Sequence, residues 1–360
     1  LDVNYGTSLG KDKSFINVTG SFQLRGQTSR AKDATGNLFS AFNAIEQRAI
    51  ENGTNINALW GNINNTPNSA QILSTIKTSA LGVDYFTAGQ QASILGATTI
   101  ADMQTALNFD ATAGELKYRN LERNNFNMNV GQSSLQSAQF FVNAAYPIND
   151  NLELYAFGGT SHRTGEAAGF YRKPNQSRTY TALYPNGFLP EIHSTINDIS
   201  AAAGIRGTIF KDWKFDLSNA FGRNGFDYTI ENTQNSSLRE NSPTKFDAGG
   251  LAFSQNTTNF DISKKINQLN VAFGAEVRHE NFQINEGEED SYNQYDINGG
   301  VVTATTANNI KATDFYNGVL GGYAGAIYGS ATTAYNGQRA GGAQVFPGFK
   351  PANAIDKGRT

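Results

Sequence analysis

Apolar and polar residues alternate along much of the chain, in pairs of runs joined by short polar turns. In one run Ile16, Val18, Phe22 and Leu24 are separated by polar residues. Successive side chains of a strand point to opposite faces, so such runs predict strands with one apolar and one polar face. Four pairs of strands are expected, with turns at residues 10–13, 149–151, 210–213 and 264–267.

Long polar segments connect each pair of strands to the next, on the side opposite the turns. Short turns at one end and long loops at the other are typical of transmembrane β-barrels. A soluble β-sandwich has the same alternation, with the apolar face as its core. Runs of about 12–18 residues exceed the five or six of a globular strand and suffice to span a membrane. We therefore predict an all-β fold, a transmembrane antiparallel β-barrel with long, partly helical extracellular loops.

Composition excludes several classes of site. The 360 residues include no cysteine, so there is neither a disulfide nor a thiolate metal site. His162, His193 and His279 are too dispersed for a zinc motif, and we expect no metal site and no cofactor. A net charge of −3 gives no basic surface for nucleic acid. The chain contains no nucleophile elbow, phosphate-binding loop or metalloprotease motif, so we do not expect an enzyme.

The first long loop, about residues 31–133, has helical periodicity. Leu38, Phe42, Ile45 and Ala49 are spaced as one face of a helix, and Gly53 is a plausible stop. Residues 72–80 predict a second helix, and a capping box at residues 99–102 predicts a third. The segment is either a folded cap with its own small core or a lid that docks a partner. Packing alone explains the spacing and favours the cap.

The second long loop, residues 166–194, is rich in aromatic residues, proline and glycine. Such side chains bind organic molecules by stacking and hydrogen bonding, or they pack against neighbouring loops. The candidate substrate contacts are Arg172, Tyr180, Tyr184, Asn186 and Phe188, with His162 and Arg163 below them at the outer end of a strand. The acidic run around Gly287 lacks EF-hand spacing and indicates a solvated loop rather than a calcium site.

Four segments divide the chain: barrel strands at 1–31, an extracellular insertion with helices at 32–133, strands with loops at 134–285, and an extracellular loop at 286–360. The sequence begins inside a predicted strand and stops in loop-like sequence, and we expect an internal segment of a longer protein. Strand direction places both ends on the outer side, so at least one strand is expected beyond each end. The inward parity is left unassigned for the strands around residues 155–157 and 219–221.

Several stretches carry a resemblance to a known family. They are Gly165–Arg172, Tyr184–Ile192, Ser242–Gly250 with Gln255–Ser263, Gly274–Glu280 with Gly287 and Ser291–Tyr292, and Gly341–Phe349. In this order they resemble TonB-dependent outer-membrane receptors. The resemblance spans most of residues 1–31 and 134–360, and the insertion at 32–133 is not part of it.

The resemblance implies a plug inside a barrel of about 22 strands. It also implies a place in the outer membrane of a Gram-negative bacterium, and energy from a TonB complex that acts on a part of the protein preceding Leu1. The expected function is binding of an organic substrate at the outer loops and its import into the periplasm, the substrate being a siderophore, glycan, peptide or cofactor. The alternatives are a barrel platform that docks a surface lipoprotein or other partner at 32–133, and a passive porin.

Overall fold

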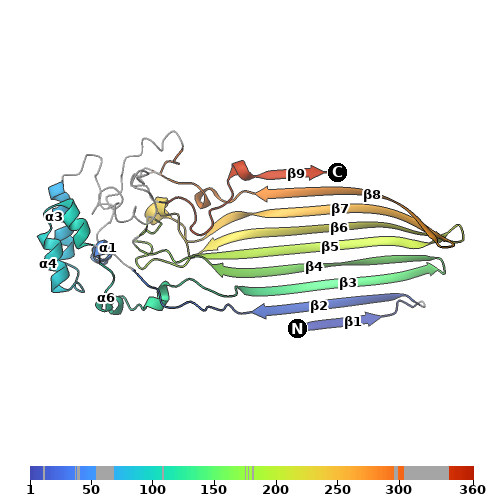
Figure 1. Ribbon diagram of the computed structural model, residues 1–360, viewed down its shortest axis with the longest axis horizontal. Helices are drawn as coiled ribbons and strands as arrows, with labels where there is room; N and C mark the ends of the chain where they lie inside the picture. Colours follow the sequence, from blue (N-terminus) through green and yellow to red (C-terminus); the bar gives the residue numbers. More distant parts are fainter. Residues whose placement is uncertain are drawn as a thin grey trace.

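The computed structural model describes residues 1–360 except 11–12, 37, 39–40, 54–68, 108, 175, 177, 181, 296–298 and 304–339. The described strands form one open antiparallel sheet in which neighbours in sequence are neighbours in space (Figure 1). A mainly antiparallel β-fold is therefore confirmed. The strands are β1 (Asp2–Thr7), β2 (Phe15–Arg25), β3 (Ser134–Asn149), β4 (Leu152–Ala168), β5 (Glu191–Ile209), β6 (Trp213–Glu231), β7 (Phe246–Ile266), β8 (Leu269–Asn285) and β9 (Ile355–Arg359).

The short turns lie at one end of the sheet, the turn end, and the long connections lie at the other, the loop end (Figure 1). The predicted turns at 149–151 and 210–213 are confirmed to within one residue, whereas residues 11–12 lie outside the described residues. The predicted turn at 264–267 was placed too early. Lys264 and Lys265 belong to β7 and pair with Val271 and Asn270. The ammonium group of Lys264 lies 2.9 Å from Asp212 and over the ring of Trp213.

Cross-strand register gives the sheet one apolar and one polar face, because directly paired residues project to the same side. On the apolar face Val18 pairs with Val142, and Phe260 pairs with Ala275. On the polar face Thr19 receives a hydrogen bond from Asn4 at 2.7 Å. Phe273 on the apolar face is 64% exposed, so no described element covers that face there.

In β4 and β6 the sequence left open which residues project from which face, and contacts with neighbouring strands settle this. The hydroxyl of Tyr155 lies 2.9 Å from a carboxylate oxygen of Asp216, which places Tyr155 on the polar face and Ala156 on the apolar face. Asn219 projects from the apolar face, where its amide donates to Asn256 at 3.0 Å and to Thr258 at 2.8 Å. These hydrogen bonds satisfy a polar side chain in an otherwise apolar row.

Helices occupy most of the described part of the insertion: α1 (Ala41–Glu51), α3 (Ser69–Ala80), α4 (Ala88–Gly96), α5 (Ile100–Ala106), α6 (Ala113–Tyr118) and a 3₁₀ turn, η1 (Arg123–Phe126). The three predicted helices are confirmed as α1, α3 and α5. The Thr99–Asp102 capping box opens α5, and Gly53, with φ 76°, lies just beyond α1. The helices α4 and α6 were not predicted. No described helix is long and apolar enough to cross a membrane.

The helices share a core of their own. Ile45, Ile76, Val83, Ile94 and Met103 are each fully buried within one cluster. The expected cap with its own small core is therefore the arrangement that the structure has.

The segment 286–360 was expected to be a loop, but β9 lies within it and pairs with β8. Charged residues hid this strand in the sequence. In the sheet they find partners, since the Asn281 amide donates to Asp356 at 2.6 Å and Arg359 pairs with Glu280. Three short 3₁₀ turns, η2 (Ser236–Asn241), η3 (Glu289–Ser291) and η4 (Pro351–Asn353), lie in the loops.

Candidate functional site

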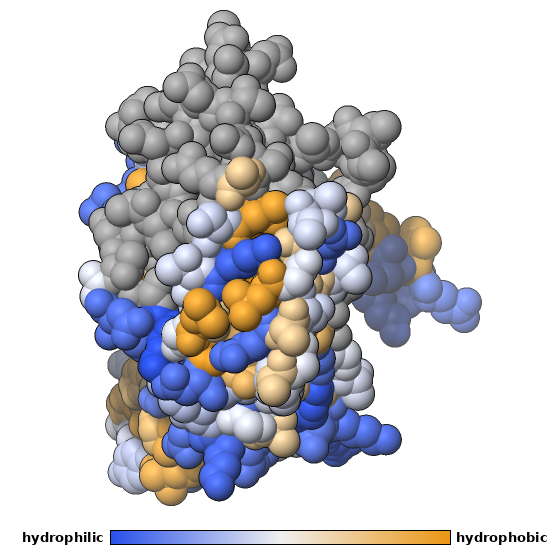
Figure 2. Space-filling view, turned by 90° about the vertical axis from the view of Figure 1, so that its left-hand side faces the viewer, coloured by the Kyte–Doolittle hydropathy of each residue, from blue (hydrophilic) through white to orange (hydrophobic). Residues whose placement is uncertain are grey.

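The loops at the loop end are bonded to one another. Thr233, in the β6–β7 loop, accepts a hydrogen bond at its backbone oxygen from the Tyr184 hydroxyl of the β4–β5 loop at 3.2 Å. The hydroxyl of Thr233 donates to the backbone oxygen of Gln344 at 3.1 Å. The amide of Asn235 donates to the backbone oxygens of Asp290 and Asn293 at 2.8 and 2.9 Å. Viewed from the helix-bearing end, the described surface mixes hydrophobic and hydrophilic residues (Figure 2).

Backbone pairing holds the β4–β5 loop in a fixed shape. Arg172 and Phe188 exchange two backbone hydrogen bonds, of 2.7 and 3.0 Å. Gly187 closes the turn through Tyr184–Pro185–Asn186 with φ 77°, a backbone conformation that favours glycine. A Cβ at Gly187 would lie 2.2 Å from the backbone oxygen of Arg172. The described part of the loop around Arg172 and residues 184–188 is thus held by its own backbone contacts, and such a fixed shape lowers the entropy cost of binding.

Most of the side chains in this loop that were proposed as substrate contacts are buried within the loops. Tyr180, Phe188 and Arg172 are 2%, 3% and 9% exposed, and the Tyr184 ring packs on Phe188 with 4.5 Å between centroids. Their packing fits the interpretation that these side chains brace the loop. Burial also raises the pKa of Tyr184 to about 12.

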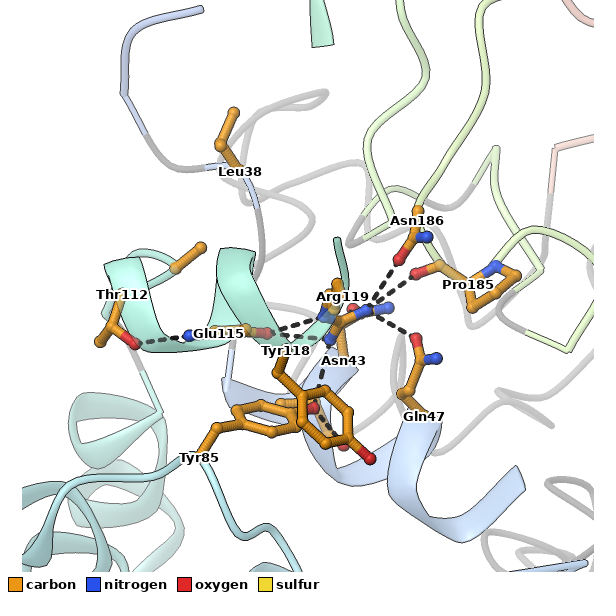
Figure 3. A network of polar contacts seen from close by, with 12 residues as sticks. Leu38, Asn43, Gln47, Tyr85, Thr112, Glu115, Tyr118, Arg119, Pro185 and Asn186 are labelled. Carbon is orange, nitrogen blue, oxygen red and sulfur yellow. Dashed lines mark hydrogen bonds and ion pairs between the residues drawn. The ribbon is translucent and has the colours of Figure 1, made fainter. Parts of the chain in front are cut away.

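Asn186 contacts the inserted helices through Arg119, a residue that the sequence analysis did not select (Figure 3). The guanidinium group of Arg119 donates to Oδ1 of Asn186 at 3.1 Å and to the Pro185 backbone oxygen at 3.3 Å. It also donates to Oε1 of Gln47 at 2.6 Å, and to Oε1 of Glu115 at 2.8 Å. The network joins α1, α6 and the β4–β5 loop.

The ion pair between Arg119 and Glu115 is almost completely buried. Their side chains are 1% and 3% exposed. Burial raises the pKa of Glu115, and the positive charge of Arg119 offsets part of that rise. Burial likewise raises the pKa of Tyr85, whose hydroxyl lies 3.5 Å from Arg119. The i, i+4 spacing of Glu115 and Arg119 is the sequence signal that could have pointed to this pair, but α6 was not predicted.

His162 and Arg163 were expected together, but they lie on opposite faces of the sheet because they are consecutive residues of β4. His162 shares the apolar face with Asn197, whose Oδ1 lies 2.7 Å from its Nδ1. Arg163 lies on the polar face. A site on the polar face therefore includes Arg163 and excludes His162.

Arg163 belongs to a cluster of polar side chains on β4, β5 and β6. Nη2 of Arg163 donates to Oδ2 of Asp198 at 2.7 Å, and the hydroxyl of Ser161 donates to the same oxygen at 2.7 Å. The amide of Asn224 donates to the other carboxylate oxygen. The Nε–H group of Arg163 has no acceptor among the described residues. The cluster therefore holds an ion pair in which one buried N–H donor of Arg163 has no acceptor among the described residues.

Aromatic side chains lie above this cluster, toward the loop end. Tyr228, on the polar face of β6, packs against Phe346 with ring centroids 4.8 Å apart, and Phe346 packs against Phe349 at 5.7 Å. Ile230 and Phe246 belong to the same buried group. Residues 343–349 thus cover the part of the polar face nearest the loop end.

Charged pairs continue along the polar face toward the turn end. Arg206 lies 2.6 Å from Glu153 and 5.0 Å from the ring centroid of Tyr155. On β8, Arg278 lies 2.8 Å from Glu276. This face offers hydrogen-bond donors and acceptors along its length, which suits recognition of a polar molecule.

Comparison with known proteins gives no match: no family model, curated protein or solved structure is similar to this chain. Its function is therefore argued from the two faces of the sheet and the loops.

Proposed function

We propose that the chain is part of the wall of a transmembrane β-barrel in the outer membrane of a Gram-negative bacterium. In this proposal the protein is a TonB-dependent receptor that binds a polar organic substrate and imports it into the periplasm. It carries out no covalent chemistry. The apolar face contacts lipid, the polar face lines the interior, the loop end faces outward, and further strands close the barrel beyond β1 and β9.

The observation that carries this proposal is the uncovered apolar face. Val3, Leu24, Phe273 and Val277 are between 58% and 65% exposed. Large contiguous apolar surfaces are rare on soluble monomers and mark contact with a membrane or a partner. Strands β3 to β8 have 16–21 residues, more than the 9–11 that span a bilayer. On β2 the apolar row from Ile16 to Leu24 measures about 27 Å at 3.4 Å per residue, close to the roughly 25 Å band of such barrels.

The proposed recognition site lies on the polar face, on the turn-end side of the aromatic rings of Tyr228, Phe346 and Phe349. Arg163 is its main contact. Its side chain is 37% exposed, and its guanidinium group can donate to a carboxylate, phosphate or hydroxyl oxygen of a substrate. The β4–β5 loop forms the rim above this site. Arg172, Tyr180 and Phe188 hold that rim in shape, and Tyr184 and Asn186 link it to the neighbouring loops.

The test uses the full-length protein expressed in its own host, with its level in the outer membrane measured for every variant. Candidate substrates are screened for uptake that requires the TonB complex. Arg163→Gln should then lower uptake at least about tenfold at an unchanged protein level. His162→Gln is the matched control, since it changes the adjacent residue on the opposite face and should leave uptake unchanged.

Uptake that persists without TonB would favour the porin. Failure of the protein to fractionate with the outer membrane would contradict the whole proposal.

A second candidate is a platform that docks a partner protein. The observation that favours it is the helical insertion, which has its own buried core and projects from the loop end (Figure 1). A deletion of residues 40–125 that abolishes co-purification of a stoichiometric surface partner, with substrate uptake unaffected by Arg163→Gln, would support this candidate over the receptor.

A further inference from the structure

Three possible metal ligands come together at the loop end on the same side of the sheet as the apolar face, although they are far apart in sequence. Glu166 of β4 pairs directly with His193 of β5. Glu191 lies two residues before His193 and therefore projects from the same side. One ligand atom from each of these residues lies within 4.8 Å of the other two. The register of β4 and β5 thus produces a cluster that no sequence motif predicts.

The donor set is one imidazole nitrogen and two carboxylate groups. Bonds from Zn²⁺ to such donors are roughly 2.0–2.2 Å long, so two donors on one ion stand at most about 4.4 Å apart. Nε2 of His193 already lies 3.2 Å from Oε2 of Glu191. The three ligand atoms lie within 4.8 Å of one another, so binding of one ion by all three requires rotation of these side chains. An imidazole donor favours a first-row transition ion or Zn²⁺ over Ca²⁺, which takes oxygen ligands.

Carboxylate groups outnumber positively charged groups around these residues, which favours binding of a cation. Glu231 pairs directly with Glu191, and its Oε2 lies 3.9 Å from Nε2 of His193. Like charges opposite each other destabilise a sheet. The only lysine or arginine paired with these residues in the described part of the chain is Lys245, 2.7 Å from Glu231. Three carboxylates, those of Glu166, Glu191 and Glu231, thus lie around His193 with one ammonium group beside them.

We infer that Glu166, Glu191 and His193 bind a divalent transition-metal ion such as Zn²⁺. Side chains of Glu191 and His193 are each 31% exposed, so solvent ions can reach them. Glu166 lies just before the β4–β5 loop, and Glu191 and His193 begin the strand after it. The ion would tie the two ends of that loop together and fix its position over the sheet. This role does not depend on the identity of the transported substrate.

The test measures Zn²⁺ binding by calorimetry to the full-length protein in detergent, after removal of bound metal by a chelator. The wild type should bind at this site, and His193→Ala and Glu191→Gln should each bind at least about 100-fold more weakly or lose one equivalent of metal. Co²⁺ provides an independent readout, because its absorption spectrum reports a nitrogen ligand that His193→Ala removes. Binding should also slow amide exchange at both ends of the β4–β5 loop.

The matched controls are His162→Ala and His279→Ala, which remove the other two histidines and should leave binding unchanged. Equal affinity and stoichiometry in the wild type and His193→Ala would overturn the inference, as would absence of binding to the wild type. If His193→Ala does not assemble, Glu191→Gln decides the question, because it keeps the shape of the side chain.

Discussion

Arg119, one residue beyond the end of α6, donates a hydrogen bond of 3.1 Å to the side chain of Asn186 in the β4–β5 loop. The two residues are 67 positions apart in sequence. Through this contact and its bond to the Pro185 backbone, Arg119 fastens the inserted helices to the rim of the proposed recognition site. The insertion therefore contacts the β4–β5 loop through this buried guanidinium group, and also through the ring of Phe126, which packs against Tyr171 at 5.2 Å between centroids.

Arg119→Leu should weaken the attachment of the insertion to the loop around Asn186. It leaves the carboxyl group of Glu115 buried without its partner, and breaking a buried ion pair costs about 3–5 kcal/mol. Native-state amide exchange should show local opening in residues 113–127 and 183–188, with the strands unaffected. Lys117→Leu is the control, because it removes a charge from an exposed position of the same helix. Equal protection of both segments in Arg119→Leu and wild type would contradict the coupling.

Alkaline pH should loosen the β4–β5 loop. Burial raises the pKa of Tyr184 from 10.0 to about 12, so the folded loop favours the protonated phenol. The stabilising contribution of Tyr184 is complete below pH 10 and is lost as pH rises through about 12. Proteolysis of the loop should accelerate in that window. Tyr184→Phe should remove this part of the pH dependence and also the hydrogen bond to Thr233, and an unchanged profile would refute the assignment.

Charges on the apolar face should prevent assembly in the membrane. Val18→Arg and Phe273→Arg each place a cation on this face, at a cost of roughly 2–4 kcal/mol in the middle of a bilayer. Thr19→Arg places the same charge on the polar face and should be milder. The measurement is the amount of folded protein in the outer membrane, detected by heat-modifiable electrophoretic mobility. Equal tolerance of all three changes would indicate a soluble fold.

The orientation of the sheet can be tested with single cysteines, because the chain contains none of its own. Ser93→Cys lies on an exposed position of α4 at the loop end, and Asp150→Cys lies in the exposed turn between β3 and β4. On intact cells a membrane-impermeant thiol reagent should label the first and spare the second. Lysed cells should show labelling of both. Labelling of Asp150→Cys alone on intact cells would reverse the proposed orientation.

Local features of the fold were determined by the sequence alone. The alternation from Ile16 to Leu24 sets the two faces of β2, because side chains two positions apart necessarily share a side. The Thr99–Asp102 capping box opens α5 for a similar reason, since its hydrogen bonds span only three residues. Gly53 follows α1 in a conformation that glycine adopts most easily.

Only the tertiary structure decided the features that depend on how neighbouring strands are aligned. Tyr155 and Asn219 follow ambiguous patterns, and only pairing with neighbouring strands assigned their sides. The strand β9 has few apolar residues, so its existence depends on backbone pairing with β8 and on charged partners there.

The sequence alone likewise did not determine which residues come together in the proposed recognition site and the proposed metal site. Arg163 and His162 are adjacent in sequence but separate to opposite faces, whereas Glu166 and His193 are distant in sequence but directly paired. The Arg119–Asn186 contact likewise joins two loops of independent sequence. Periodicity along the chain fixes which way each side chain points, but contacts between strands and loops depend on how segments tens of residues apart are aligned, and only the folded chain sets that alignment.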